Sequence, residues 1–451
     1  MERPIINSGG APEWWVAGQR AARARFAALP MPARKDEDWR FANVRELDLA
    51  PWAEAVTAGV AAGERERLLA DSVAAFDTAG RAVFGNDELL AFDAGVDLAK
   101  QGVIFEPLTV ALARHSDLLQ KYFMTLPVML GSQKFAALHQ ARCRDGMLLH
   151  VPRGAKVALP LTVWHWLGGM RGAVFPHTLV VADEGSEVTL VEFYRSLDER
   201  AGLNVSVADL FVGAGARVNY LCAQAWNENT LSFQLGATSV ARAGAAKTLT
   251  VNLGGKFVRT ESHSRLADPG ARSEMLGLCV GHGRQEYDQR TLQDHLAPGT
   301  WSDLLYKNVL NHSAKTIFEG LIKVGPGAQQ TDAYQTNRNL LLSGDAEADS
   351  MPGLEIANDD VKCSHGASTG QIGREELFYL LQRGIPRHEA HRLVAAGFTE
   401  EALARFGNEG VSGQLRGMIA EKFRRGKDLQ PAVADGEAVD ATDARGWQGT
   451  L

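Results

Sequence analysis

The chain has 451 residues, of which 45% are hydrophobic and 22% charged, a composition typical of a globular protein with two or three domains. Its 54 acidic residues outnumber 47 basic ones, and the net charge of −7 argues against a nucleic-acid-binding protein, which would carry a basic surface. The four cysteines are too widely spaced for a disulfide framework, and we recognise neither a signal peptide nor an apolar run of about 20 residues, so we expect a cytoplasmic protein with no membrane partner.

Residues 1–145 predict a mostly helical amino-terminal domain. Helical patterns of apolar residues cover 12–28, 61–75, 107–123 and 133–141. A short strand is expected at 81–84. Between the first two helices, residues 29–41 read LPMPARKDEDWRF, a charge cluster that is typical of a solvated turn anchored by its tryptophan. No catalytic arrangement is evident in this region.

From Gly146 the hydrophobic pattern changes to a period of two, which predicts short strands such as MLLHV, TLVVA and VTLVEF. Glycines followed by a small residue recur every 26 to 31 residues beside these strands, at Gly154, Gly185, Gly215, Gly244, Gly270, Gly299 and Gly327. Glycine permits the tight corner that bulkier residues resist. The spacing predicts a right-handed parallel β-helix over 146–364, with two or three strands in each rung and flanking helical regions as caps. The alternative, an antiparallel sandwich, would show turn signals every 8–12 residues.

Residues 365–427 predict a carboxy-terminal helical domain of four short helices. These are expected at 375–383, at 386–397, from Thr399, and from Ser412, which we expect to cap the last one. Apolar stripes run along the first and last helices, formed by Leu377, Leu380, Leu415, Met418, Ile419 and Phe423. Such stripes usually belong to the core, but four short helices bury little on their own, so these residues are also candidates for binding a partner protein. Residues 428–451 are acidic and rich in alanine, which predicts a disordered tail.

Cys363 and His365 are the candidate metal-ligating pair. Residues i and i+2 of a strand point to the same side, so the thiol and the imidazole can converge on one spot. No Cys-x-x-Cys or His-x-x-His accompanies them, so the chain holds at most part of a metal site, and the pair is otherwise read as a buried cysteine beside a histidine that caps a turn. The histidines at 263, 282, 295 and 312 lack ligand spacing. We expect Cys222 and Cys279 to be small core side chains.

Enzyme signatures are missing from the sequence. Gly254-Gly255-Lys256 is followed by Phe257 and lacks the upstream glycine of a phosphate-binding loop, and no Gly-x-Ser-x-Gly elbow occurs. We therefore expect no enzymatic activity. The enzymes that remain as alternatives are a β-helix carbohydrate lyase, which would need an export signal and clustered calcium-binding acids, and an acyltransferase, which would need a strict six-residue repeat.

Three consecutive runs resemble the carboxy-terminal half of the SufB/SufD family of the SUF iron–sulfur cluster assembly system. They read GLIKVGPGAQQTDAYQTNRNLLLS, AEADSMPGLEIANDDVKCSHGASTGQI and LFYLLQRGIP. The cluster at 29–41 is similar to the family's amino-terminal LP-x-RK-x-E-x-W motif, with Met31-Pro32 as an insertion. Within the family, VKCSHGAS resembles the SufD pattern, because SufB typically has glutamate where Gly366 stands. A SufB-type main scaffold is the alternative.

The resemblance implies a scaffold subunit that forms a complex with a SufB-like subunit through the β-helix and with the ATPase SufC through helices at 375–426. The candidate contacts to SufC are the six apolar residues of the carboxy-terminal stripes. His365 matches a SufD histidine associated with cluster formation at the SufB–SufD interface, and Cys363 is its neighbour. We thus expect a transient iron–sulfur cluster in the complex, no tightly bound cofactor in the isolated chain, and a homodimer when the chain is alone.

Overall fold

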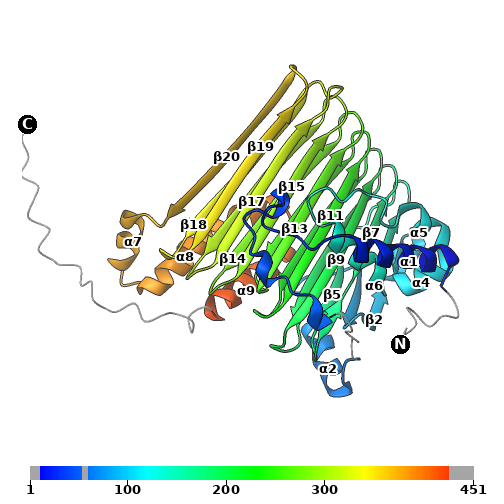
Figure 1. Ribbon diagram of the computed structural model, residues 1–451, viewed down its shortest axis with the longest axis horizontal. Helices are drawn as coiled ribbons and strands as arrows, with labels where there is room; N and C mark the ends of the chain where they lie inside the picture. Colours follow the sequence, from blue (N-terminus) through cyan, green and yellow to red (C-terminus); the bar gives the residue numbers. More distant parts are fainter. Residues whose placement is uncertain (1–10, 53–58, 426–451) are drawn as a thin grey trace, which may run out of the picture.

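Residues 11–52 and 59–425 are described by a computed structural model of the chain (Figure 1). Its core is a parallel β-solenoid, which confirms the fold expected from the sequence. Two long sheets face each other, and the chain alternates between them from β7 onward, with one strand per rung in each main sheet. Among the described strands, the pairings of β1 with β2 and of β3 with β4 are antiparallel, and the others are parallel.

The two sheets are named here by their strands, given in spatial order. Sheet A consists of β2 (Glu88–Ala94), β1 (Gly80–Gly85), β5 (Leu161–Leu167), β8 (Glu187–Ser196), β10 (Arg217–Ala225), β12 (Ala245–Asn252), β14 (Arg272–Gly281), β16 (Trp301–Leu310), β18 (Thr331–Leu341) and β20 (Val361–Gln371). Sheet B consists of β19 (Glu347–Ile356), β17 (Lys315–Val324), β15 (Glu286–His295), β13 (Phe257–Leu266), β11 (Leu231–Val240), β9 (Gly202–Val212), β7 (His177–Ala182), β4 (Gly146–Val151) and β3 (Ile104–Pro107), with β6 (Gly172–Val174) beside β9.

Alternate side chains of each strand face the interior of the solenoid, as the period of two requires. In β10, Tyr220 and Cys222 belong to the core between the sheets, whereas Leu221 and Ala223 belong to a second core on the outer face of sheet A. The strands of sheet A are thus buried on both faces over much of their length. This explains why several of them read as continuous apolar runs.

The corners follow the expected glycine spacing at most rungs. Gly185, for example, has φ 67°, a left-handed conformation that glycine adopts without steric cost. Two corners differ, because the left-handed residue beside Gly244 is Ala243 (φ 53°) and the one after Gly327 is Gln330 (φ 57°). The strands on both sides of these corners still pair in parallel, so the solenoid tolerates a change of residue at the turn.

The amino-terminal region contains more strand than the sequence indicated. Its helices are α1 (Glu13–Ala28), α2 (Ala62–Asp71), α3 (Val96–Lys100), α4 (Leu108–Arg114), α5 (Ser116–Tyr122) and α6 (Gln133–Arg142). β1 pairs in parallel with β5, so the sheets begin well before residue 146. The helix expected at 107–123 is two helices, because His115 leaves the helical conformation (φ −131°) and Ser116 and Asp117, residues that favour a helix start, open α5.

An arm of three short 3₁₀ helices, at Glu37–Trp39, Val44–Glu46 and Ala50–Trp52, lies on the outer face of sheet B. The fully buried Arg259 of β13 connects this arm to sheet B. Its guanidinium lies 3.7 Å from the centre of the Trp39 ring, donates to the Asp38 carbonyl at 2.9 Å, and forms ion pairs with Glu261 at 2.9 Å and with Asp288. Trp39 therefore anchors the segment 29–41 to sheet B, and the charged groups next to its ring, those of Arg259, Glu261 and Asp288, are buried.

The carboxy-terminal region has three described helices, α7 (Arg374–Leu381), α8 (Arg387–Phe406) and α9 (Glu409–Arg425), rather than the expected four. The second and third predicted helices are one, because α8 continues through Gly397. An interior glycine costs a helix about 1 kcal/mol, which burial of Leu403 and Phe406 against sheet A offsets. Ser412 lies inside α9 and donates a hydrogen bond to the Leu403 carbonyl at 3.0 Å, so it joins two helices instead of capping one.

The solenoid also extends farther than expected, since β20 continues to Gln371 and not only to residue 364. The tail expected at 428–451 lies outside the described residues. No helix within the described part of the chain is long and apolar enough to cross a membrane.

Replacement of Arg259 by methionine should lower the free energy of unfolding by about 3–5 kcal/mol, because it leaves the buried Glu261 without its counter-charge and leaves Asp288 with Arg290 alone. Chemical denaturation followed by circular dichroism measures the change. Arg272→Met is the matched control: Arg272 is exposed on the outer face of sheet A, so its replacement should change stability by about 0.5 kcal/mol or less. Equal effects of the two substitutions would contradict an anchoring role for Arg259.

Candidate functional site

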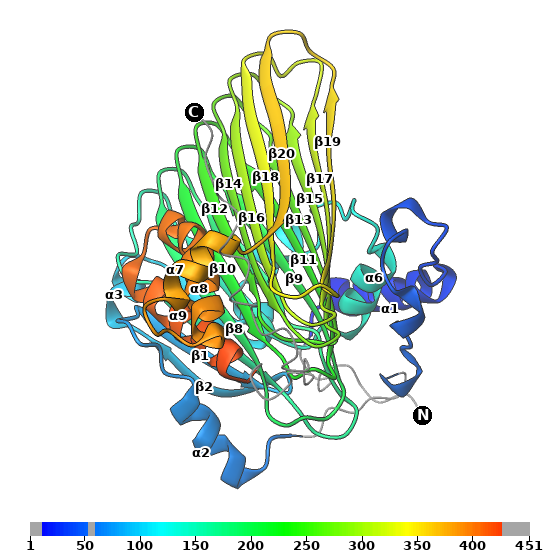
Figure 2. The same ribbon diagram turned by 90° about the vertical axis from the view of Figure 1, so that its left-hand side faces the viewer.

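The last rung of the solenoid, formed by β19 and β20, is open. β19 pairs with β17 and β20 pairs with β18, and no other described strand covers their far edges (Figure 2). Leu354 and Ile356 of β19 are 37% and 42% exposed, although their register partners in β17, Ile322 and Val324, are fully buried. An unpaired edge beside exposed apolar side chains is a surface suited to another strand.

Cys363 and His365 lie on β20 at this open rung. Their register partners in β18 are Ala333 and Gln335, so both belong to the row that faces the interior, and they share one side of the strand. Cys363 is half-buried against the apolar cluster that contains Ala333, whereas His365 is exposed. Burial raises the pKa of the Cys363 thiol, which keeps it protonated until a cation favours the thiolate.

The described residues contain no group of three or more histidine, cysteine or acidic side chains arranged to hold a metal ion. Cys363 and His365 therefore supply part of a ligand set at most. The scattered histidines lie beside other side chains: His263 is 3.6 Å from Asp294, although neither of its ring nitrogens has a hydrogen bond, and His295 shares hydrogen bonds with Thr300 and Ser302 at 2.7 and 2.8 Å. These side chains do not converge on the open rung.

The apolar stripe of α9 packs within the chain. Leu415, Met418 and Ile419 are buried in the core between α8, α9 and the outer face of sheet A, and Phe423 is half-buried against the same core. These side chains are already covered by this chain, which agrees with the interpretation of the stripe as part of the core; whether they also contribute to partner binding stays a prediction. The sequence pattern indicated an apolar face correctly, but not what covers it.

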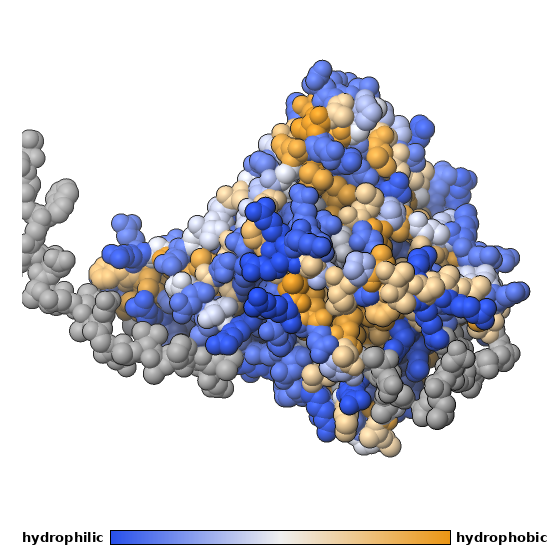
Figure 3. Space-filling model, viewed as in Figure 1, coloured by the Kyte–Doolittle hydropathy of each residue, from blue (hydrophilic) through white to orange (hydrophobic). Residues whose placement is uncertain are grey.

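α7 differs from the other two carboxy-terminal helices because none of its residues is buried. Leu377 and Leu380 are half-buried, while Phe378 and Tyr379 are 59% and 56% exposed. Apolar surface is visible at the tip formed by α7, on the left of the molecule (Figure 3). Sequence reasoning missed Phe378 and Tyr379 because it selected the face with the most leucines.

Ion pairs hold α8 against sheet A. Arg405 contacts Glu274 at 2.7 Å and Asp303 at 2.5 Å, and Lys307 of β16 contacts Glu401 at 2.7 Å. The sheet thus fixes α8, which in turn positions the exposed α7 near the open end of the solenoid (Figure 2).

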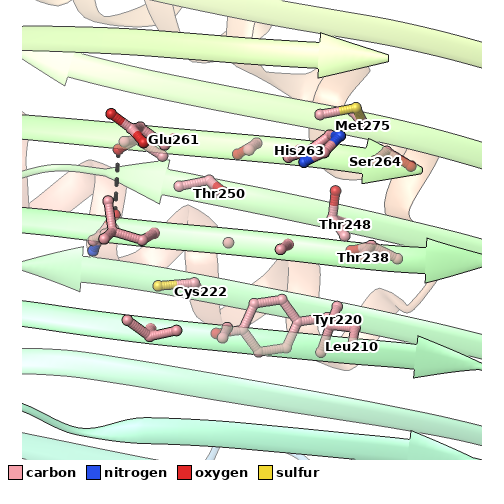
Figure 4. Close-up of a pocket in the computed structure, with 18 of the residues that line it drawn as sticks. Leu210, Tyr220, Cys222, Thr238, Thr248, Thr250, Glu261, His263, Ser264 and Met275 are labelled. Atoms are coloured by element: carbon pink, nitrogen blue, oxygen red, sulfur yellow. Dashed lines mark hydrogen bonds between the residues drawn. The ribbon is translucent and has the colours of Figure 1, made fainter. Parts of the chain in front are cut away.

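A cavity of about 50 Å³ lies between the sheets, beside Tyr220, Cys222, Thr250 and Met275 (Figure 4). Burial raises the pKa of the Cys222 thiol well above its usual value, and the same holds for Cys279. Both cysteines are buried, which confirms that they are small core side chains.

A buried carboxylate near this cavity belongs to a polar cluster that the sequence did not reveal. Glu192 accepts hydrogen bonds from Thr178 at 2.6 Å and from Tyr220, and its carboxylate lies 3.4 Å from His165. Burial opposes the charge of Glu192, but the hydrogen bonds and the charge of His165 outweigh it, and the pKa of the carboxyl is lowered. The hydrogen bonds within the cluster account for its stability in the core.

Comparison with known proteins gives the family. A model described as "SUF system FeS cluster assembly, SufBD core domain" matches residues 165–398, from within β5 to α8, and one described as "SufBD protein N-terminal region" matches 8–163. The chain belongs to the SufB/SufD family. It is therefore an iron–sulfur cluster assembly protein of the SUF type, as its carboxy-terminal runs indicated, and the lyase and acyltransferase alternatives gain no support.

Relatives by sequence agree with this assignment and make the chain SufD-like. The iron–sulfur cluster assembly protein SufD of Bacillus subtilis is 32% identical over 338 residues, which are 73% of this chain and 76% of the relative. An iron–sulfur cluster assembly SufBD family protein of Staphylococcus aureus (strain USA300) is 27% identical over 415 residues, 88% of this chain and 87% of the relative. A homologous SufBD family protein of Staphylococcus saprophyticus is 26% identical over the same length.

Proposed function

We propose that this SufD-like chain is a non-enzymatic, cytoplasmic scaffold subunit whose open last rung pairs with a SufB-like subunit and helps to build an iron–sulfur cluster there. The observation that carries the proposal is the position of His365 and Cys363 on an exposed strand with an unpaired edge. A partner of the same fold would continue the stacking of rungs, cover Leu354 and Ile356, and bring further ligands to the two side chains.

The chemistry of the pair suits this role. Iron accepts both imidazole and thiolate ligands, and clusters are commonly held by cysteine with occasional histidine. Two ligands from this chain are too few to hold a cluster, which is the cargo of the complex and not a resident cofactor. Assembly between two subunits would allow the cluster to form when they associate and to leave when they separate.

The ATPase SufC is proposed to bind the exposed side of α7 and the adjoining part of α8. Phe378, Tyr379, Leu381 and Leu393 are exposed there, and aromatic side chains are frequent anchors of protein interfaces. Of the six candidate SufC contacts expected from the sequence, Leu377 and Leu380 adjoin this surface. The four on α9 would contribute only indirectly, by holding the helices in place. The isolated chain would use its open rung to form a homodimer.

Charged residues at the open rung should prevent association with the SufB-like subunit. The double substitution Leu354→Lys and Ile356→Lys places two cations where an apolar interface is proposed, and we expect it to weaken the complex at least about tenfold. Size-exclusion chromatography of co-expressed subunits measures this. Leu296→Lys, on an equally exposed leucine at a corner beyond β15, should leave the complex intact; loss of the complex in the control as well would contradict a specific interface.

His365→Ala should lower the iron and sulfide content of the reconstituted complex without dissociating it, because alanine removes a ligand and leaves the strand intact. Cys363→Ser should have an equal or smaller effect. Content is measured after anaerobic reconstitution of complexes of matched stoichiometry, together with visible absorbance. His115→Ala, a half-buried histidine between α4 and α5, serves as the control. If His365→Ala retains the wild-type cluster content, the ligands lie elsewhere, most plainly on the partner chain.

Substitution of an exposed aromatic residue of α7 should weaken binding of the ATPase without changing the stability of the fold. We expect Phe378→Asp to weaken SufC binding at least about tenfold with an unchanged melting temperature, since the side chain packs little within this chain. Met418→Ala should instead lower the free energy of unfolding by about 2–5 kcal/mol, because it leaves a cavity beneath α9. Binding is measured by calorimetry with purified SufC. Val96→Asp, on an exposed valine of α3, is the control, and an equal loss in that variant would count against α7 as the docking surface.

A further inference from the structure

A large cleft lies at the end of the solenoid remote from the open rung. It measures about 700 Å³ and is lined by residues of α2 and α9, of sheet A and of the loops that follow its strands. Arg67 of α2 and Arg425 of α9 stand on opposite walls, and Trp166 and Arg195 form part of the floor. Clefts of about 300–1,000 Å³ are the size that binds small organic molecules.

Arg195 is a cation of this cleft that has no ion pair, although Glu421 and Asp71 lie near enough to favour its charge. It projects from the outer face of β8, where the rings of Trp164 and Trp166 lie 5.9 and 6.0 Å from the centre of its guanidinium. Within the described part of the chain, no carboxylate is within ion-pair distance and Nε has no hydrogen-bond partner. A guanidinium stays charged in proteins, and a buried donor without an acceptor is unfavourable. The tryptophans therefore hold in place a cation that still lacks an anion.

Lys422 of α9 adds a second cation. It is 7% exposed, and its Nζ donates to Gln285 Oε1 at 2.6 Å and lies 3.4 Å from His282 Nε2. No carboxylate of the described residues is within ion-pair distance of it. Burial lowers the pKa of Lys422 to about 8, so the ammonium form prevails at neutral pH. An amide oxygen and an imidazole thus contact the ammonium group at the wall of the cleft, and the carboxylate of Glu228, which contacts His282, favours its charge from farther away.

Five acidic side chains also line the cleft, Asp71, Asp198, Glu199, Glu228 and Glu421. Three of them already have partners. Glu228 contacts His282 at 2.5 Å, Glu421 contacts Arg425 at 2.6 Å, and Asp198 accepts hydrogen bonds from two backbone N–H groups at 2.9 and 3.0 Å. Asp71 and Glu199 remain to accept hydrogen bonds from donors on a ligand. Arg67 also lacks an ion pair, but it is exposed and donates to the Leu197 carbonyl at 3.4 Å, so Arg195 and Lys422 are the less exposed cations of the cleft that have no ion pair.

We propose that this cleft binds a small phosphate-bearing molecule whose anionic group contacts Arg195 and Lys422. The planar guanidinium matches two phosphate oxygens at once, and the ammonium adds a point charge. A phosphate fills only a small part of 700 Å³, so the remaining space fits an organic group of about nucleoside size beside Trp166 and the acidic rim. This inference is independent of the open rung and of the proposed partners.

Calorimetric titration of the purified full chain tests the inference with three probes: inorganic pyrophosphate, adenosine diphosphate and adenosine. We expect both phosphate compounds to bind one site and adenosine to bind far more weakly. Arg195→Gln and Lys422→Gln should each weaken the binding of pyrophosphate at least about tenfold, since each removes a charge-assisted contact. Arg200→Gln removes an exposed arginine just beyond the cleft and should leave binding unchanged.

Three results would overturn the inference. These are no binding of pyrophosphate to the wild-type chain, equal loss in Arg200→Gln and Arg195→Gln, and binding of adenosine as tight as that of adenosine diphosphate. Circular dichroism establishes that each variant is folded. Should Arg195→Gln fail to fold, Arg195→Lys and Lys422→Gln decide: the first keeps the charge without the planar fork and should bind pyrophosphate more weakly, and unaltered binding in both would refute the site.

Discussion

Hydrogen bonding between successive rungs is the interaction on which this structure depends. Each inner strand satisfies its backbone groups through the strand before it and the strand after it, so the sheets have two ends where pairing must stop. At the first end the outermost strands, β2 and β3, pair antiparallel with their neighbours and are followed by helices. At the last end β19 and β20 have no such covering among the described residues. The asymmetry places the exposed edge, and with it Cys363 and His365, at one end of the molecule.

The outer faces of the sheets impose a second requirement. Sheet A is apolar outside and is covered by α8 and α9, whereas sheet B carries buried charges such as Arg259 and Asp288 beneath the amino-terminal arm. A buried charge needs its partners in place, so the arm is part of the fold and not an appended motif. The covering elements leave α7 uncovered near one end and a cleft between α2 and α9 near the other.

The sequence allowed the repeat to be predicted because the spacing is a local property of the chain. The period of two and the glycine at positions such as Gly185 were enough to indicate rungs of two or three strands, and the structure has two. What covers a face depends on distant residues. Thus the stripe of α9 with Leu415 and Met418 was recognised, but the pattern could not decide between the core and a partner surface, and nothing around Arg259 indicated that Trp39 lies against it. Gly397 was predicted to end a helix because the free-energy cost of an interior glycine can be read from the local sequence. The burial of Leu403 and Phe406 that offsets this cost depends on sheet A, which is distant in the sequence.

The same distinction applies to the candidate ligands. Strand geometry predicted that Cys363 and His365 share a side, but only the position of β20 at the end of the sheet shows that one is half-buried and the other exposed. The difference has a chemical consequence. A thiol must lose its proton to bind a metal, and burial raises the pKa of Cys363, so ligation by this residue requires the positive charge of iron to be close already. The imidazole binds through a lone pair and is accessible from outside. Under the proposed function, a metal would thus meet the accessible His365 first, and Cys363 would join as the proposed partner subunit encloses the site.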